Sequence, residues 1–445
     1  MKRVGLVAYW YPPRQAAGAL RAAALARYLP AFGWEPVVVT VRPRSSLHLP
    51  PGEPVCDDVP PPALATTDRA WHALAAAAVE ALRGSDALEG LKSENAFASR
   101  RPHARAAHWI YRHWLSFPDD TWPWLVDRRS VARVFAAHGV DAIVSTSPPP
   151  TAHLVAAAAA RRLRVPWVAD YRDPWSQRSV WRRAWPLAGV EARLERHTLS
   201  QAAHVVTVSA PIAENLRRLL GRPVSVVPNG FDPADRDVAA IDPLPIAGDR
   251  FTLVHTGTLT NQSRDPGLLF AALHALVARG DLPIGALEVW FVGRHPDVAR
   301  RTAAQWPALA PAIHYAGAVP RATALDAQRR ATVLVALGSP DAAYDGDVPT
   351  KVFEYLDARR PILAIASPES ALAALLAATR GGRVASSSAE AEAALVHWLG
   401  RWRHDGRLTG SSDPQAIARY ERRSLTGEFA QILDRAAAGI LDEAV

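Results

Sequence analysis

Cysteine is almost absent from this chain of 445 residues, since Cys56 is the only one. A single thiol excludes an internal disulfide framework and a zinc site built on several thiolates, and it fits a reducing compartment. Long apolar runs are also missing, because no stretch approaches the ~18 apolar residues of a membrane-spanning helix. The short apolar run at the amino end meets Tyr11-Pro12-Pro13-Arg14 with no small-residue cleavage site after it. We therefore expect a cytoplasmic protein without a secretory signal.

The composition is that of a folded protein with an uneven charge. Hydrophobic residues make up 49% and charged residues 21%, which excludes wholesale disorder. The formal net charge is +8, and residues 101–200 hold 15 Lys and Arg against 8 Asp and Glu, together with 8 of the 15 tryptophans. This basic, Trp-rich stretch indicates an anionic partner, such as a phosphorylated substrate, a nucleic acid or a membrane surface. Arginine residues on solvated helix faces would give the same composition. The composition therefore does not distinguish this explanation from an anionic partner.

Short apolar runs alternate with helical periodicity along most of the chain. After the first predicted strand, a helix over Gly18–Phe32 ends at Gly33. The predicted strands are Arg3–Tyr9, Pro36–Val41, Ala142–Ser145, Trp167–Ala169, His204–Val208, Val224–Val227, Phe251–His255, Leu287–Val292, Ile313–Tyr315, Thr332–Leu337, Ile362–Ile365 and Arg383–Ala385. Strands separated by helices predict an α/β protein with two doubly wound parallel sheets. In such folds, ligands bind at the carboxyl ends of the strands, so we expect a cleft between the two domains.

The segment Phe231–Arg250 lacks apolar periodicity and is rich in Pro and Asp, which is typical of a linker. We therefore predict a first domain over residues 1–235, a linker over 236–250 and a second domain over 251–408. Residues 409–445 are expected to be helices that pack back on the first domain. Residues 43–130 are less regular and are interpreted as an insertion in the first domain.

Several polar residues of the first half follow predicted strands. Gly18 lies where the first loop enters a helix, so backbone can approach an anionic ligand there, although a helix-start glycine without a ligand is an equal alternative. Asp170, Arg172 and Asp173 lie just past a strand, where an acid and a guanidinium can orient a sugar hydroxyl or a phosphate. His153, at another strand–helix junction, either points into the same cleft or packs as a helix-start histidine. The dinucleotide fingerprint GxGxxG is absent, which argues against a dehydrogenase.

The second half carries its own candidates after strands. Gly257 and Thr258 follow a strand, and Arg264 precedes the next helix, from where it can reach a diphosphate. Thr350 is a candidate helix cap, and Lys351 lies in the first helical turn, where a cation opposes the helix dipole. A role in binding an anion would explain why Lys351 occupies this unfavourable position. Glu354 lies one turn later on the same face, so a simple surface ion pair with Lys351 is the alternative.

These segments together resemble the retaining glycosyltransferases of family 4, which have the two-domain GT-B fold. The resemblance covers nearly the whole chain except about residues 43–130. It is carried by the order and spacing of YPPRQAAGALRAAALARYL, SPPPTAHL, WVADYRDPW, VSAPIAENL, VVPNGFDP, HTGTL, RDPGLL and PTKVFEYLDARRPIL. The resemblance implies transfer of a sugar, with retention and without a metal cofactor, from a nucleotide-sugar donor to a glycan, lipid-linked or small-molecule acceptor, as in polysaccharide assembly.

The resemblance also assigns roles to individual residues. It implies that Gly18 lies near the donor phosphates, that Arg264 contacts the diphosphate and that Glu354, the second glutamate of an E-x7-E pattern, holds the nucleotide ribose. The full set of implied donor-binding residues is Gly18, Gly257, Thr258, Arg264, Val348, Thr350, Lys351 and Glu354, and the catalytic candidates are His153, Asp170, Arg172 and Asp173.

The sequence departs from the family pattern at two positions. Gly346 stands where the first glutamate belongs, which leaves the sugar contact to Asp345 or Asp347, and Thr258 stands where the arginine of a G-R-L turn belongs. The D-x-D spellings at 235–237 and 345–347 lack the context of a metal site, so we expect no metal.

Three further functions remain open at this point. They are a catalytically impaired sugar-nucleotide-binding or scaffolding protein, a sugar-nucleotide epimerase, and attachment to the anionic inner face of the plasma membrane. No recognition module for nucleic acid is present, so we expect no nucleic-acid partner.

Overall fold

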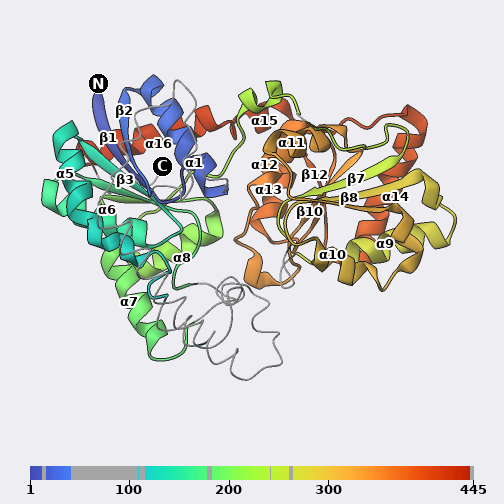
Figure 1. Ribbon diagram of the computed structural model, residues 1–445, viewed down its shortest axis with the longest axis horizontal. Coiled ribbons are helices and arrows are strands. Elements are labelled where there is room, and N and C mark those ends of the chain that lie inside the picture. Colours follow the sequence, from blue (N-terminus) through green and yellow to red (C-terminus); the bar gives the residue numbers. More distant parts are fainter. Residues whose placement is uncertain are drawn as a thin grey trace. The chain divides into compact units, whose positions relative to one another are not determined.

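The computed structural model describes residues 1–12, 17–41, 109, 116–177, 183–240, 242–259 and 264–440. The chain forms two compact units, each built around its own sheet (Figure 1). The first unit comprises residues 1–208, 212–227 and 426–445, and the second comprises residues 209–211 and 228–425.

The first unit contains a six-stranded parallel sheet in the order β2-β1-β3-β4-β5-β6. Its strands are β1 (Lys2–Ala8), β2 (Trp34–Val39), β3 (Ala142–Ser147), β4 (Trp167–Tyr171), β5 (His204–Thr207) and β6 (Ser225–Val226). Its helices are α1 (Ala17–Tyr28), α5 (Arg128–His138), α6 (Thr151–Leu163), α7 (Leu187–Leu199), α8 (Ala210–Leu220) and most of α16 (Arg422–Ala437), with 3-10 turns η1 (Leu29–Phe32) and η4 (Trp122–Asp127).

The second unit repeats this plan in the order β12-β11-β10-β7-β8-β9, again parallel throughout. Its strands are β7 (Phe251–Thr256), β8 (Leu287–Val292), β9 (Ile313–Gly317), β10 (Val333–Leu337), β11 (Ile362–Ile365) and β12 (Gly382–Ala385). Its helices are α9 (Gly267–Ala278), α10 (Pro296–Ala303), α11 (Arg321–Arg330), α12 (Lys351–Ala358), α13 (Ala371–Thr379), α14 (Ser388–Asp405) and α15 (Pro414–Ala418), with 3-10 turns η5 (Pro233–Asp237), η6 (Ile284–Ala286), η7 (Pro307–Ala312) and η8 (Ala342–Tyr344).

Both faces of the second sheet are buried, which explains why its strands are continuous apolar runs. Successive residues of β7 belong to different cores: Leu253 packs with α9 and α14, whereas Val254 packs with α12 and α13. The side chains of a strand alternate between the two faces of its sheet, so a strand covered on both faces needs an apolar residue at nearly every position.

The twelve strands predicted from the sequence are all present, with ends shifted by at most a few residues, and the predicted fold class is confirmed. The packing places two boundaries differently, because the second unit begins at residue 228 rather than 251 and continues to 425 rather than 408. Phe231 and Ile246, both within the predicted linker segment, are buried in the core of the second unit. The predicted insertion over residues 43–130 lies outside the described residues except for 109 and 116–130, where η4 and the start of α5 are found.

Each sheet has one point where the strand order reverses. In the first unit, the chain runs outward to opposite sides from β1 and β3, and in the second unit it does so from β7 and β10. The loops after these neighbouring strands diverge and leave a crevice at the carboxyl ends, which is where doubly wound folds bind ligands. The two reversal points therefore define where a site is expected in each unit.

Candidate functional site

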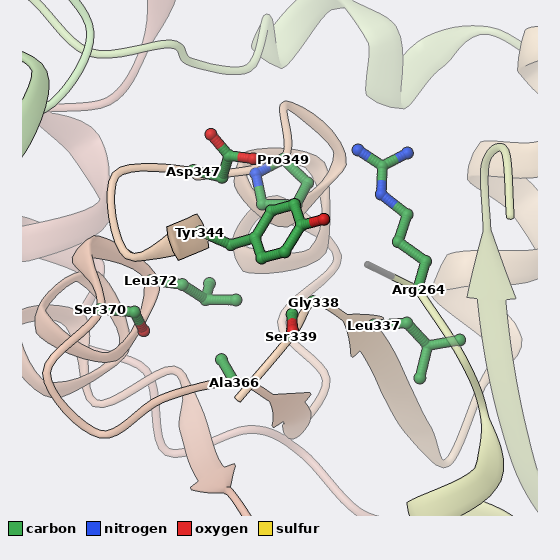
Figure 2. A pocket seen from close by; sticks show the side chains of 10 residues that line it. All are labelled: Arg264, Leu337, Gly338, Ser339, Tyr344, Asp347, Pro349, Ala366, Ser370 and Leu372. Carbon is green, nitrogen blue, oxygen red and sulfur yellow. The ribbon is translucent and has the colours of Figure 1, made fainter. Parts of the chain in front are cut away.

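A pocket of about 360 Å³, including space open to solvent, lies at the reversal point of the second sheet. Its lining comes from the loops after β7, β10 and β11 and from the segments that lead into α12 and α13: Arg264, Leu337, Gly338, Ser339, Tyr344, Asp347, Pro349, Ala366, Ser370 and Leu372. Figure 2 shows Arg264 on one side of this pocket, Ser370 and Leu372 on the other, and the ring of Tyr344 between them.

Arg264 is held in the pocket wall by its own loop. Its guanidinium donates a hydrogen bond of 3.1 Å to the backbone carbonyl of Thr258. Thr258 is the residue that replaces the arginine of the G-R-L turn expected from the family pattern. The Thr258 carbonyl thus fixes the guanidinium end of Arg264, although Thr258 brings no positive charge of its own. One cation of the pocket is therefore present and positioned.

Lys351 supplies a second cation near Arg264. It begins α12 and is half-buried, and its Nζ lies 3.1 Å from the Nε2 of His255. Burial lowers the pKa of Lys351 well below 10.5, the nearby Arg264 charge lowers it further, and Glu354 acts in the opposite direction. Two adjacent cations in a poorly solvated place repel each other, and a bound anion relieves that repulsion.

Gly257 makes room for this arrangement. Its φ of +111° lies in the region that favours glycine, and a Cβ there would be 3.0 Å from the Nζ of Lys351. Gly257 thus contributes to the site by having no side chain, which allows the Lys351 side chain to lie close to the backbone.

Glu354 is held by two polar side chains that the sequence did not single out. One carboxylate oxygen accepts a short hydrogen bond from Arg321, and the other accepts one of 3.2 Å from Gln328. Arg321 also bonds Asp235 at 2.5 Å. Glu354 does not form a hydrogen-bonded ion pair with Lys351 among the interactions of the described residues, so the simple surface pair with Lys351 is not what the structure shows.

The segment before α12 gives mixed results for the predicted contacts. Asp347 is exposed and lines the pocket, whereas the Oδ1 atom of Asp345 is buried without a hydrogen-bond partner. Val348 is half-buried and packs against the core of α12. Thr350 precedes α12 but makes no side-chain capping bond, so the prediction of a threonine cap is wrong. The missing side chain at Gly346 therefore leaves Asp347 as the pocket carboxylate of this segment.

In the first unit, the predicted polar residues form a buried network at the reversal point of the sheet. Asp170, at the end of β4, has no exposed side-chain surface and pairs with Arg21 of α1 through bonds of 2.9 to 3.1 Å. Arg21 also donates to the carbonyl of Val227. Arg172 donates to the carbonyls of Ser147 and Pro148, and its guanidinium lies so close to Gly18 that a Cβ there would be 2.6 Å away.

This network corrects the expectation for two catalytic candidates. His153 is fully buried on α6, where its Nδ1 lies 2.7 Å from the Oγ of Ser145 and its Nε2 has no partner. Burial is the main reason that the pKa of His153 falls to about 3. Neither His153 nor Asp170 has exposed surface through which it could reach a ligand. Arg172 keeps a small exposed fraction, and Asp173 is exposed.

Sequence reasoning missed Arg21, His255, Arg321, Gln328 and the pocket residue Tyr344. The sequence carries a signal only for His255, which directly precedes the Thr256-Gly257 turn at the end of a buried strand. A buried imidazole in that position needs hydrogen-bond partners, and a polar side chain that serves as its partner is a candidate residue of the binding site. The other residues lie on ordinary helix or turn positions.

Within the parts of the chain that the structure describes, no three His, Cys, Asp or Glu side chains gather as metal ligands. In the same residues, no helix has both the length and the apolar character to cross a membrane. The expectation that no metal takes part stays a prediction.

One family model matches part of this chain. Residues 91–235 match the family model described as Glycosyltransferase Family 4, which confirms the resemblance from about residue 131 to 235 and extends it back to 91. No curated protein sequence matches the chain.

Solved structures match the whole chain at low identity. Anabaena Alr3699/HepE in complex with UDP and glucose is 15% identical, with a TM-score of 0.57 over 98% of this chain and 99% of that one. Sucrose-phosphate synthase from Thermosynechococcus elongatus is 14% identical, with a TM-score of 0.52 over 98% and 97% of the two chains. A putative UDP-N-acetylglucosamine 2-epimerase from Listeria monocytogenes is 13% identical, with a TM-score of 0.52 over 100% and 99%. These likenesses show that the chain has the GT-B fold of two parallel-sheet units.

Proposed function

We propose that this chain, with its family 4 glycosyltransferase match over residues 91–235, is a retaining glycosyltransferase that uses a nucleotide-sugar donor. The observation that carries the proposal is that Arg264 lines the pocket at the reversal point of the second sheet and that its charge acts on the nearby Lys351. Two basic side chains beside a glycine that opens space fit a diphosphate. The HepE structures, which contain UDP and UDP-glucose, support a uridine nucleotide as the first donor to test.

The chemistry that these residues can supply is stabilisation of a leaving group. When the bond between a sugar and a nucleoside diphosphate breaks, negative charge develops on the oxygen of the outer phosphate. Cations that are already in position stabilise this charge without the cost of reorganising solvent. Arg264 is fixed by the Thr258 carbonyl and Lys351 by His255, so both are preorganised, and no metal is required by this step.

The remaining donor contacts are assigned from position. We assign Glu354, held by Arg321 and Gln328, to the ribose hydroxyls, because an ionised carboxylate accepts hydrogen bonds from them. Asp347 is the pocket carboxylate that replaces the glutamate missing at Gly346, and we assign it to a hydroxyl of the transferred sugar. The acceptor is a glycan, a lipid-linked saccharide or a small molecule, bound through the first unit.

Attachment to an anionic membrane is supported by the outer face of α7. Trp185, just before this helix, is 90% exposed, and Val190, Arg193 and Arg196 are exposed along it. Its carboxylates, Glu191 and Glu195, are buried on the opposite face. An indole and unopposed arginines on one face fit the interface of a bilayer with anionic headgroups.

Sedimentation with lipid vesicles tests this attachment. Phosphatidylcholine vesicles containing phosphatidylglycerol should bind the protein at low salt, and vesicles of phosphatidylcholine alone should not. Replacing Arg193 and Arg196 by glutamate should abolish the binding, whereas equal binding by that variant would exclude this face.

The donor proposal is tested by thermal unfolding with UDP-, GDP-, ADP- and TDP-sugars, followed by assays of sugar transfer. A donor raises the unfolding temperature because it binds only the folded state. The Lys351→Met variant should lose the shift, and Lys2→Met, the same change at a lysine that is 51% exposed, should keep it. Tight binding without transfer to any acceptor would favour the impaired binding protein. Formation of an epimer without acceptor would favour the epimerase, which the Listeria structure keeps as an alternative.

A further inference from the structure

The ammonium group of Lys351 is held from two sides. Lysine is rare in this chain, with only Lys2, Lys92 and Lys351, although the chain has 51 lysines and arginines together. The Nζ atom lies 3.1 Å from His255 Nε2, and a Cβ at Gly257 would lie 3.0 Å from the same Nζ. The planar guanidinium of an arginine is wider than an ammonium group, so this narrow place selects a lysine.

The hydrogen bonds of His255 fix its tautomer. Its Nδ1 lies 2.9 Å from the backbone carbonyl oxygen of Val335 on the neighbouring strand β10. A carbonyl oxygen only accepts hydrogen bonds, so Nδ1 carries the proton and donates. The Nε2 atom of the neutral ring is then an acceptor, and Lys351 donates to it.

The surroundings keep His255 neutral. Its side chain is buried, and burial lowers the pKa of His255, with further lowering by the charges of Lys351 and Arg264. A protonated ring would place two donors opposite each other at 3.1 Å. The ring is therefore a constant acceptor that does not change its charge when an anion binds.

The other N–H groups of Lys351 remain for a ligand. Among the described residues, His255 takes one of the three N–H donors of Lys351, which leaves two for a ligand. The helix dipole at the start of α12 and the nearby Arg264 both disfavour an ammonium here, so its position is stabilised by the imidazole. Without that acceptor, the long lysine side chain is free to turn away from Arg264.

We propose that His255 is a positioning residue for diphosphate recognition: its neutral imidazole holds the Lys351 ammonium beside Arg264, where both cations contact the same diphosphate. This inference rests on the proposed function, since it concerns the donor pocket. His255 acts through Lys351 and does not itself touch the ligand.

Calorimetric binding of UDP and of uridine tests this role in the full-length protein. The variants are His255→Leu, which removes the acceptor, His255→Gln, which keeps one, and Lys351→Met. His255→Leu should weaken UDP binding by about tenfold, the effect of losing an oriented charged hydrogen bond, and leave uridine binding unchanged. His255→Gln should keep most of the affinity for UDP. Adding His255→Leu to Lys351→Met should cause no further loss, because the two residues act as one unit.

Three results would overturn the inference. They are equal losses for uridine and UDP in His255→Leu, which would indicate general damage to the fold, unchanged UDP binding in that variant, and additive losses in the double variant. If the wild-type protein binds no nucleoside diphosphate, the proposed function fails together with the inference. If it binds UDP through Lys351 but His255→Leu has no effect, only the inference fails.

Discussion

The buried ion pair between Asp170 and Arg21 makes a sharp prediction about stability. The side chain of Asp170 is 0% exposed and that of Arg21 is 9% exposed, and their bonds join β4 to α1. Asp170→Ala removes the carboxylate partner of the buried Arg21 guanidinium, whose bond to the Val227 carbonyl remains. Removing one partner of a buried pair costs about 3–5 kcal/mol. For a unit of roughly 150–250 residues, this lowers the unfolding temperature by about 6–20 °C.

The assay is thermal unfolding of the full-length protein followed by circular dichroism, with two comparison variants. Glu35→Ala breaks the exposed pair with Arg3, whose side chains are 46% and 52% exposed, and should cost less than about 1 kcal/mol. The double variant Arg21→Met with Asp170→Leu removes both charges and should recover much of the loss, because apolar residues replace buried ion pairs at little cost.

Two results would refute this reasoning. A single variant that unfolds within about 2 °C of the wild type would mean that the pair is not a structural element, since that shift corresponds to less than about 1 kcal/mol. A double variant as unstable as Asp170→Ala would mean that the lost volume and not the unpaired charge is responsible. If Asp170→Ala stays stable but loses all sugar transfer, the original expectation of a catalytic Asp170 is restored.

Three further predictions concern binding and pH. Burial and the Arg264 charge lower the pKa of Lys351 in the ligand-free protein well below 10.5. The affinity for UDP, measured by calorimetry, should therefore fall about tenfold per pH unit above that pKa, and an affinity that stays constant as the pH rises to 10.5 would refute the role of the Lys351 proton. Gly257→Ala should weaken UDP binding because the new Cβ meets the Lys351 ammonium, and Gly280→Ala, also at positive φ but with nothing within 4 Å, should leave UDP affinity unchanged in the same titration. The pKa of His153 is about 3 in the folded protein and 6.5 in the unfolded chain, so the unfolded chain takes up a proton at a higher pH than the folded protein does. The free energy of unfolding should therefore fall as the pH drops from 6.5 towards 3. Urea unfolding at pH 7 and pH 5 should show a smaller loss in His153→Phe, and an equal loss would show that His153 is not the group responsible.

The sheets could be predicted from the sequence because their strands are buried on both faces. A strand such as Leu287–Val292 is apolar at almost every position, and Gly or Pro residues separate it from the neighbouring helices. The positions after the strands follow from the same pattern, so Arg264 could be assigned to the carboxyl end of the second sheet. That assignment needed no knowledge of side-chain contacts.

The contacts within the site could not be predicted, because they join residues far apart in the chain. Arg21 and Asp170 are separated by 149 positions, and His255 and Lys351 by 96. No local pattern announces such pairs, and one arginine among many carries no sign that it is buried. The sequence also left the position of His153 open, because a histidine at a helix start has the same local pattern whether it faces solvent or the core.

The domain boundary was predicted too late for a different reason. Phe231 and Ile246 stand alone among Pro and Asp residues, so no periodicity marks them as buried. Their burial depends on the tertiary packing of the second unit, including the backbone bond from the Phe231 N–H to the carbonyl of Tyr420. A segment rich in Pro and Asp is therefore weak evidence for a linker when it also contains isolated apolar residues, because these can be buried in a domain core.

The path of α16 has a consequence for how the protein is made. Phe429 and Leu433 of this helix are fully buried, and Lys2 of β1 bonds Asp434 at 2.9 Å, so residues 426–440 complete the first unit. The ribosome synthesises these residues only after the entire second unit. During translation, the second unit can therefore finish folding while the first still lacks one wall of its core, which reverses the usual order in which the amino-terminal domain folds first.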